Sequence, residues 1–210
     1  MDIKIVKAER KHFDDLLFLY YSFYVELRSK QGWSHGDIDD YREDVEDMFR
    51  RGDAIFLAYF EDKPIGFVRI SEREGSYWIE ELYVKPEYRG KGIGRKLVEQ
   101  AEKFISERDT HAYIMVLPQD KNAILFWMRM GYDLLNTIEL TKDLRSVSKS
   151  EDTHTIEVFG YPMRLYRWKN ANFSELETEY LETLSRFFRR YSRDDFLRVV
   201  INALKEALKD

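Results

Sequence analysis

The feature that most constrains this chain is a glycine-rich turn between an apparent strand and a long amphipathic run, VKPEYRGKGIGRKLVEQAEKFI. Gly90, Gly92 and Gly94 occupy alternate positions in it and are three of the ten glycines in the chain. Glycine permits positive φ and lets a ligand approach where a Cβ would obstruct it. A strand, a glycine turn and a helix in this order leave unpaired N–H groups at the positive end of the helix dipole. Such a site suits a phosphate or pyrophosphate, and four cations surround it: Arg89, Lys91, Arg95 and Lys96.

Taken alone, the glycines are equally well explained by a tight turn followed by a solvated basic helix face. The turn also departs from the commoner phosphate motifs. No Ser or Thr follows it as in a P-loop, and the last glycine of a dinucleotide fingerprint would fall on Leu97. The glycine turn therefore needs support from the rest of the chain.

Hydrophobic periodicity predicts a mixed α/β fold, with a mostly antiparallel sheet and helices on both faces. The predicted strands cover residues 3–8, 54–60, 64–72, 76–84, 112–118 and 134–141. The predicted helices cover residues 11–30, 38–51 and 93–107, with a fourth that starts at Asp120 and is closed by Gly131. We expect these elements to form one domain over residues 1–144.

A polar stretch, RSVSKSED, follows Leu144 and is typical of a linker. Beyond it the sequence predicts a hairpin around residues 160–162 and two capped helices, which together form a C-terminal extension over residues 145–210. Each terminal helix carries one apolar stripe, and one short hairpin cannot cover both. We therefore expect a homodimer that involves residues beyond Phe173.

Composition excludes several classes of protein. A net charge of −5 argues against a general binder of nucleic acid or anionic membranes, and the absence of cysteine excludes disulfides and thiol nucleophiles. The N-terminus has no apolar run that could serve as a secretion signal or membrane span, so we expect a cytoplasmic protein. Charged residues at 35% are compatible with a thermophilic source.

Arg89, Gly92 and Gly94 match the pattern R-x-x-G-x-G directly after LYVKPEY, and here the chain resembles the GNAT superfamily of acetyl-CoA-dependent N-acetyltransferases. The resemblance covers roughly the first two thirds of the chain and is most specific over residues 82–97 and 120–132. It implies acetyl-CoA as co-substrate. The residues that it assigns to the CoA pyrophosphate are Gly90, Lys91, Gly92, Ile93, Gly94 and Arg95. Those that it assigns to the pantetheine arm, through their main chain, are Leu82, Tyr83 and Val84.

The second family motif is only partly present. Ala123, Gly131 and Tyr132 fit, but Asp120 stands where the family usually has Asn and Trp127 where it usually has Tyr. In many members that Tyr protonates the departing thiolate, which an indole cannot do. Either water or another residue supplies this proton, or the step proceeds without a dedicated acid, because a thiolate is a good leaving group near neutral pH. Trp127 either packs against the pantetheine arm or is a core aromatic residue.

Acetyl transfer to an amine requires a group that removes the proton of the attacking nitrogen. Glu80 and Glu81, on the strand that by resemblance runs beside the acetyl group, are the candidates. Adjacent strand residues face opposite ways, so only one reaches the cleft unless a bulge intervenes, and we favour Glu80 narrowly. Each could equally be a surface salt-bridge carboxylate. A backbone N–H near Tyr83 or Val84 is expected to meet the developing oxyanion.

The acceptor amine is less constrained. Seven acids lie between Asp37 and Asp47, which either attract a cationic acceptor or form the solvated face of a helix. Four aromatic residues either line the acceptor site or belong to the core: Tyr20, Tyr21, Tyr24 and Trp33. The four histidines have no metal-ligand spacing, so no metal site is indicated.

Two rival functions remain open. The same fold without the chemistry would be a CoA-binding regulatory protein, because the usual Tyr is missing. RFFRRYSR, residues 186–193, could form a nucleic-acid patch, although burial explains its aromatic residues better. Turnover of acetyl-CoA with amines and salt-dependent binding of nucleic acid distinguish these alternatives.

Overall fold

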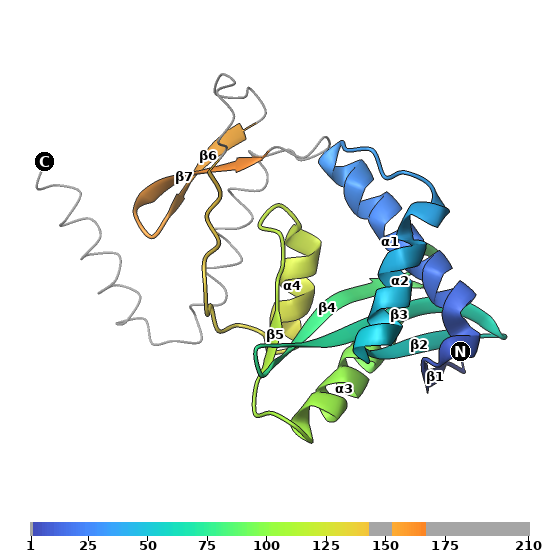
Figure 1. The fold of residues 1–210 in the computed structure, drawn as a ribbon. Coiled ribbons are helices and arrows are strands. Elements are labelled where there is room, and N and C mark those ends of the chain that lie inside the picture. Colours follow the sequence, from blue (N-terminus) through green and yellow to red (C-terminus); the bar gives the residue numbers. More distant parts are fainter. Residues whose placement is uncertain (1, 143–152, 167–210) are drawn as a thin grey trace, which may run out of the picture. The chain divides into compact units, whose positions relative to one another are not determined.

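The computed structural model describes residues 2–142 and 153–166 (Figure 1). The chain divides into two compact units, Met1–Val116 and Leu117–Asp210. The predicted boundary between residues 144 and 145 lies outside the described residues and stays a prediction. The same holds for the two terminal helices, the basic stretch over residues 186–193 and the dimer contact expected beyond Phe173.

A five-stranded sheet forms the first unit. Its strands are β1 (Lys4–Lys7), β2 (Ala54–Phe60), β3 (Lys63–Arg73), β4 (Ser76–Val84) and β5 (Ala112–Ile114). They lie in sequence order across the sheet, and only the β4–β5 pair is parallel. The predicted mixed and mostly antiparallel sheet is confirmed. The last strand is shorter than the predicted 112–118.

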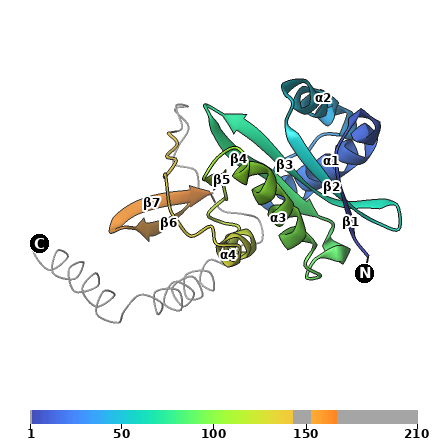
Figure 2. The same ribbon diagram turned by 90° about the horizontal axis from the view of Figure 1, so that it is seen from below.

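Helices cover both faces of this sheet (Figures 1 and 2). The helical segments are η1 (Arg10–His12), α1 (Phe13–Gln31), η2 (Ile38–Tyr41), α2 (Arg42–Arg51), η3 (Pro86–Tyr88) and α3 (Ile93–Ser106). Leu16 and Val45, from α1 and α2, pack in one core with Leu57 and Phe67 of the sheet. On the opposite face Phe56 meets Phe104 of α3, because neighbouring residues of a strand point to opposite sides.

A bulge in β4 interrupts its pairing with β3. Arg69 lies opposite Glu81, while the next β3 residue, Ile70, lies opposite Ile79, so Glu80 is an extra residue in the ladder. Because Arg69 and Ile70 are adjacent, they face opposite sides of the sheet, and so do their partners Glu81 and Ile79. The bulge therefore changes which β4 residues face α1 and α2.

The second unit contains α4 (Lys121–Arg129) and a hairpin of β6 (Thr153–Val158) and β7 (Tyr161–Tyr166). The predicted helix and hairpin are present, but the strand predicted over residues 134–141 is wrong. That segment has no strand pairing in the described part of the chain, and Leu134 is 84% exposed. A segment with high strand propensity forms a strand only where a neighbouring strand exchanges hydrogen bonds with it. The strand propensity of residues 134–141 was therefore not enough to predict a strand there.

Among the residues that the structure describes, no helix has the length and apolar character needed to cross a membrane.

Candidate active site

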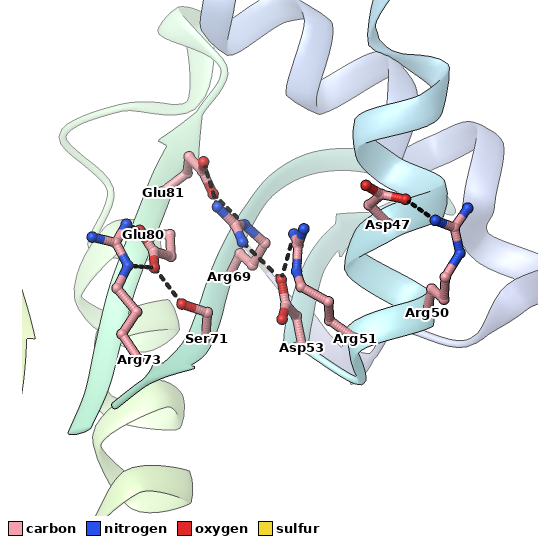
Figure 3. A network of polar contacts seen from close by, with 9 residues as sticks. All are labelled: Asp47, Arg50, Arg51, Asp53, Arg69, Ser71, Arg73, Glu80 and Glu81. Carbon is pink, nitrogen blue, oxygen red and sulfur yellow. Dashed lines mark hydrogen bonds and ion pairs between the residues drawn. The ribbon is translucent and has the colours of Figure 1, made fainter. Parts of the chain in front are cut away.

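The centre of the site is a buried ion pair between the neighbouring strands β3 and β4 (Figure 3). Arg69 of β3 donates from Nε and Nη2 to the two carboxylate oxygens of Glu81, at 2.6 and 2.8 Å. Its Nη1 donates to Asp53 at 2.7 Å, just before β2 begins. Asp53 is also 3.3 Å from Arg51, the last residue of α2. One guanidinium thus joins β4 to the α2–β2 turn.

Glu80 has its own set of partners on β3. Arg73 donates from Nε to Glu80 at 2.6 Å, and the Ser71 hydroxyl donates to the same oxygen. Ser71 and Arg73 follow Arg69 at alternate positions, so they lie on the same face of the strand. Because Glu80 bonds to them and Glu81 bonds to Arg69, the bulge brings both carboxylates to one face. The sequence left open whether a bulge occurs between the two glutamates, and the structure shows that one does.

The two carboxylates differ in how tightly they are held. Burial raises the pKa of Glu81, against the opposing hydrogen bonds and charge of Arg69. Burial disfavours the charged form of Arg69, but Glu81 and Asp53 more than offset this and raise its pKa. Arg69 is buried and cannot leave, whereas the Arg73 side chain is half-exposed. Glu80 is therefore the carboxylate with the more exposed ion-pair partner.

A cavity of about 730 Å³ opens beside Glu80. Its walls come from the α2–β2 turn, the last residues of β3, the start of β4 and the C-terminal end of α3. It forms because β3 is longer than β2: Ala54, the first β2 residue, pairs with Ile70. Ser71 and Arg73 thus lie beyond the reach of β2, and the cavity lies at the exposed end of the sheet.

The glycine turn lies at the other end of β4. Gly90 and Gly92 have φ of 74° and 79°, values that favour glycine, and a Cβ built on either meets nothing within 4 Å. Gly92 is the N-cap of α3 and has no side chain to cap the helix, so the first-turn N–H groups of Ile93, Gly94 and Arg95 receive no side-chain cap from it. The Arg95 side chain is exposed and the Ile93 side chain is buried.

Arg89 acts as an anchor for this turn. Its Nη1 and Nη2 donate to the Glu26 carboxylate of α1 at 3.0 and 2.5 Å, and its Nε donates to the Val84 carbonyl at 2.8 Å. Its guanidinium also lies over the Tyr83 ring, 5.6 Å from the centroid. Burial raises the pKa of Glu26, but Arg89 and Lys30 together hold it below its ordinary value. Arg89 thus fixes the turn to α1.

One edge of β4 is open in its second half. β4 pairs with β3 along its whole length, to Val84, but pairs with β5 only through Tyr77, Trp78 and Ile79. In the described residues of the first unit, the main chain from Glu80 to Val84 has no ladder partner on the β5 side. These groups include Leu82, Tyr83 and Val84, which the family resemblance assigned to the pantetheine arm.

Asp120 and Trp127 belong to the second unit. The Asp120 side chain caps α4 by accepting a hydrogen bond from the Ala123 N–H at 3.1 Å. Trp127 is buried and makes edge-on contacts with Phe126 and Tyr132, with ring centroids 5.2 and 5.1 Å apart. Both residues thus have local structural roles, and any role with CoA stays a prediction.

The aromatic residues of α1 are mainly core residues. Tyr20 is buried, with its ring centroid 4.8 Å from that of Tyr24 and 5.9 Å from that of Tyr41. Burial raises the pKa of Tyr20, so its hydroxyl stays protonated. Trp33 lies outside this core, exposed and under the guanidinium of Arg28.

Most of the acidic run has structural partners. Asp37 and Asp40 form a capping box at the start of η2, and Asp47 forms an ion pair with Arg50. Glu46 likewise pairs with Arg10. These contacts favour the interpretation of the run as a solvated, ion-paired helix face. Within the described ranges, no group of three or more His, Asp or Glu side chains is placed to hold a metal ion.

Sequence reasoning missed the partners of the two glutamates: Asp53, Arg69, Ser71 and Arg73. For the three β3 residues the signal was present in RISER, where residues 69, 71 and 73 are polar at alternate positions after the apolar stretch of residues 65–68. Only the register with β4 identifies them as partners, and the bulge shifts that register by one residue.

Comparison with known proteins gives a consistent result. The sequence model of the Acetyltransferase (GNAT) family matches residues 14–132. An uncharacterized N-acetyltransferase of Archaeoglobus fulgidus is 31% identical over 114 residues, which are 51% of this chain and 76% of the relative. A thialysine N-epsilon-acetyltransferase of Sus scrofa is 29% identical over 87 residues, but the match spans 41% of this chain and only 45% of that protein.

Solved structures share the fold. The PaiA N-acetyltransferase of Thermoplasma acidophilum, crystallised with coenzyme A, superimposes with a TM-score of 0.53 at 20% identity. The superposition covers 62% of this chain and 89% of that one.

Proposed function

The chain belongs to the GNAT family of acetyltransferases, and on this premise we propose that it transfers an acetyl group from acetyl-CoA to a primary amine with Glu80 as the base. The observation that carries the proposal is the β4 bulge, because it places two carboxylates on one face of the strand. The open edge of β4 and the glycine turn lie further along the same strand and its continuation.

Acetyl-CoA is bound by backbone groups in this proposal. The N–H groups of the α3 first turn lie at the positive end of the helix dipole and suit the pyrophosphate. Arg95 and Lys96 add charge there, while Arg89 positions the turn through Glu26. The open main chain of Leu82 and Tyr83 supplies the donors and acceptors that an amide-containing arm requires.

The chemistry assigned to the chain is proton transfer and charge stabilisation. The amine nitrogen forms a bond to the acetyl carbon, the carbon–sulfur bond breaks, and the nitrogen gives its proton to Glu80. Glu80 then no longer balances the charge of Arg73, whose half-exposed side chain can turn toward solvent. A backbone N–H near Tyr83 or Val84 meets the charge that develops on the carbonyl oxygen. The thiolate leaves without a dedicated acid, because Trp127 offers none.

A primary amine is the acceptor class that the similarity to a thialysine N-epsilon-acetyltransferase supports. The acidic run of residues 37–47 contributes little to this choice, since its members mostly cap helices or pair with arginines.

The test combines binding and turnover on the full chain. Calorimetric titration with CoA should give saturable binding, and a thiol-release assay should detect free CoA when acetyl-CoA is mixed with primary amines. Mass spectrometry of the acetylated amine identifies the product. Binding without turnover on any amine would favour the regulatory alternative. Failure to bind CoA would contradict the proposal altogether.

A further inference from the structure

The Arg73 side chain makes three kinds of contact beside the proposed base. Its Nε donates to one oxygen of Glu80 at 2.6 Å, and its Nη2 donates to the other (Figure 3). Its guanidinium carbon lies over the Trp78 ring, 5.2 Å from the centroid, and its Nη1 lies 3.8 Å from the sulfur of Met115. The guanidinium thus occupies a cation site made of the Glu80 carboxylate, the Trp78 ring and the Met115 sulfur.

The groups around this cation lie on one face of the sheet. Ser71 and Arg73 are two residues apart on β3, and Trp78 of β4 lies opposite Ser71. Tyr113 of β5 lies opposite Trp78, and the two rings stack with their centroids 5.1 Å apart. Glu80 accepts hydrogen bonds from Ser71 and Arg73, so its carboxylate lies on the same side as both rings.

The cation is held less firmly than the groups that bind it. Arg73 exposes 48% of its side chain, whereas only 10% of Glu80 is exposed. The Ser71 hydroxyl donates to Glu80 independently of Arg73, and the Tyr113 ring supports the Trp78 ring. Exposed ion pairs and exposed cation–π contacts are each weak. The guanidinium can therefore leave while the carboxylate and the ring stay in place.

An ammonium ion carries the charge that this cation site binds, and it brings three N–H donors on a smaller group. Met115 is 60% exposed and Tyr113 is only partly buried, so apolar surface continues outward from the site. We propose that Arg73 blocks the acceptor subsite of the free enzyme and that an alkylammonium ion displaces it, binding between Glu80 and Trp78. The first methylene groups of the acceptor then lie over Tyr113 and Met115.

This inference rests on the proposed function and specifies the form in which that same site takes its acceptor. It adds a binding step and changes no bond of the reaction. The bound ammonium gives one proton to Glu80, which passes it to water, and the neutral nitrogen then attacks the acetyl carbon. Arg73 thus competes with the acceptor. Its loss should improve amine binding, whereas the loss of a residue that positions Glu80 would impair turnover.

The kinetics of Arg73→Ala give the first test. With primary alkylamines as acceptors, KM should fall on the order of tenfold relative to wild type without a fall in kcat, because no side chain then competes for Glu80. Urea denaturation checks that the variant is folded at the assay temperature. An unchanged or higher KM, or the lower kcat expected if Arg73 merely positions Glu80, overturns the proposal.

The matched control is Arg42→Ala. Arg42 also pairs with a carboxylate, that of Asp39, and its guanidinium lies over the Phe13 ring, 5.5 Å from the centroid. These contacts involve neither Glu80 nor Trp78, so the control should leave KM for the amine unchanged. An equal fall in KM in the two variants would show a general effect of lost positive charge and overturn the assignment.

A binding test that needs no turnover gives the second. The chain has four tryptophans, and Trp78→Phe identifies the indole N–H signal of Trp78 in the NMR spectrum. Methylguanidine should fill the cation site in Arg73→Ala and shift that signal at a concentration on the order of tenfold lower than in wild type, where Arg73 competes. Butylamine, present as its ammonium ion, should shift the same signal in wild type. If neither compound shifts it, no cation binds there.

The two tests separate the subsite from the chemistry. Turnover with a KM that does not depend on Arg73 overturns the blocked subsite and leaves the acetyltransferase intact. Absence of turnover with every amine, in wild type and variants alike, overturns the proposed function, and with it the acceptor role of the cation site even where methylguanidine binds.

Discussion

Arg69 holds Glu81 with two parallel hydrogen bonds, from Nε at 2.6 Å and from Nη2 at 2.8 Å, across the β3–β4 ladder. Both side chains are buried, and Asp53 accepts from the third guanidinium nitrogen. Arg69 thus fixes Glu81 in place, whereas Glu80, the proposed base one residue away, pairs with the half-exposed Arg73.

Arg69→Met should therefore be strongly destabilising, because it leaves Glu81 and Asp53 buried without their main counter-charge. We expect a loss of about 3–5 kcal/mol in the free energy of unfolding, measured by urea denaturation. The control is Arg73→Met, which removes a half-exposed partner and leaves the Ser71 hydrogen bond to Glu80, so it should cost less than Arg69→Met. Equal losses in the two variants would contradict the distinction between the pairs.

Glu80→Gln should lower kcat by on the order of 10²-fold with little change in CoA affinity, because glutamine is isosteric but cannot accept the proton. Glu81→Gln should instead lower stability, since Arg69 loses its charged partner, with a smaller effect on kcat where the protein is folded. Stopped-flow thiol release and calorimetry measure the two quantities. A larger kcat loss in Glu81→Gln would transfer the role to that residue.

Substitutions in the glycine turn should distinguish obstruction from backbone strain. Gly94 lies inside α3, so Gly94→Val adds a side chain beside the first-turn N–H groups without requiring a positive φ. We expect CoA binding to weaken at least tenfold, roughly the loss of one charge-assisted hydrogen bond. Gly75→Val is the control for strain, because Gly75 has φ of 80° in the β3–β4 turn, at the other end of β4 from the glycine turn. CoA affinity of Gly94→Val equal to wild type would remove the turn from the binding site.

Acidification should weaken the anchor between Glu26 and Arg89. Arg89 keeps the Glu26 pKa below its ordinary value of 4.5, so this carboxylate contributes stability above pH 4.5 that is lost as the pH falls through its folded-state pKa. The difference in unfolding free energy between wild type and Glu26→Gln should accordingly shrink from pH 7 toward pH 3. Urea denaturation at several pH values measures it, and a difference independent of pH would show that the ion pair adds nothing.

The sequence was sufficient for what depends on local periodicity. The strand and helix order of the first unit, the closure of α2 at Gly52 and the glycine turn before α3 all follow from residue spacing and glycine placement. Both candidate carboxylates were also identified. What could not be predicted was the register: an extra residue at Glu80 decides which side chains share a face, and no local pattern marks it.

The same limit explains the segment over residues 134–141. Its alternating apolar residues indicate a strand, but a strand exists only if another strand pairs with it, and that is a property of the tertiary fold. Arg69 illustrates the converse case. It is a charged residue in the apolar part of β3, and the sequence alone does not explain its burial. The structure does, because Glu81 and Asp53 both accept hydrogen bonds from its guanidinium.

In the part of the first unit that the structure describes, residues 80–84 of β4 have no strand partner on the β5 side, and this has a consequence for handling the purified protein. Main-chain groups without a ladder partner act as a template on which a strand of another molecule can add, and natural proteins usually cover or charge such edges. We expect ligand-free protein to self-associate through residues 80–84 on storage and CoA-saturated protein to remain dispersed. Dynamic light scattering over several days, with and without CoA, should show the difference. Bound CoA would then also protect the protein from aggregation, because it occupies the strand edge on which a second molecule could add.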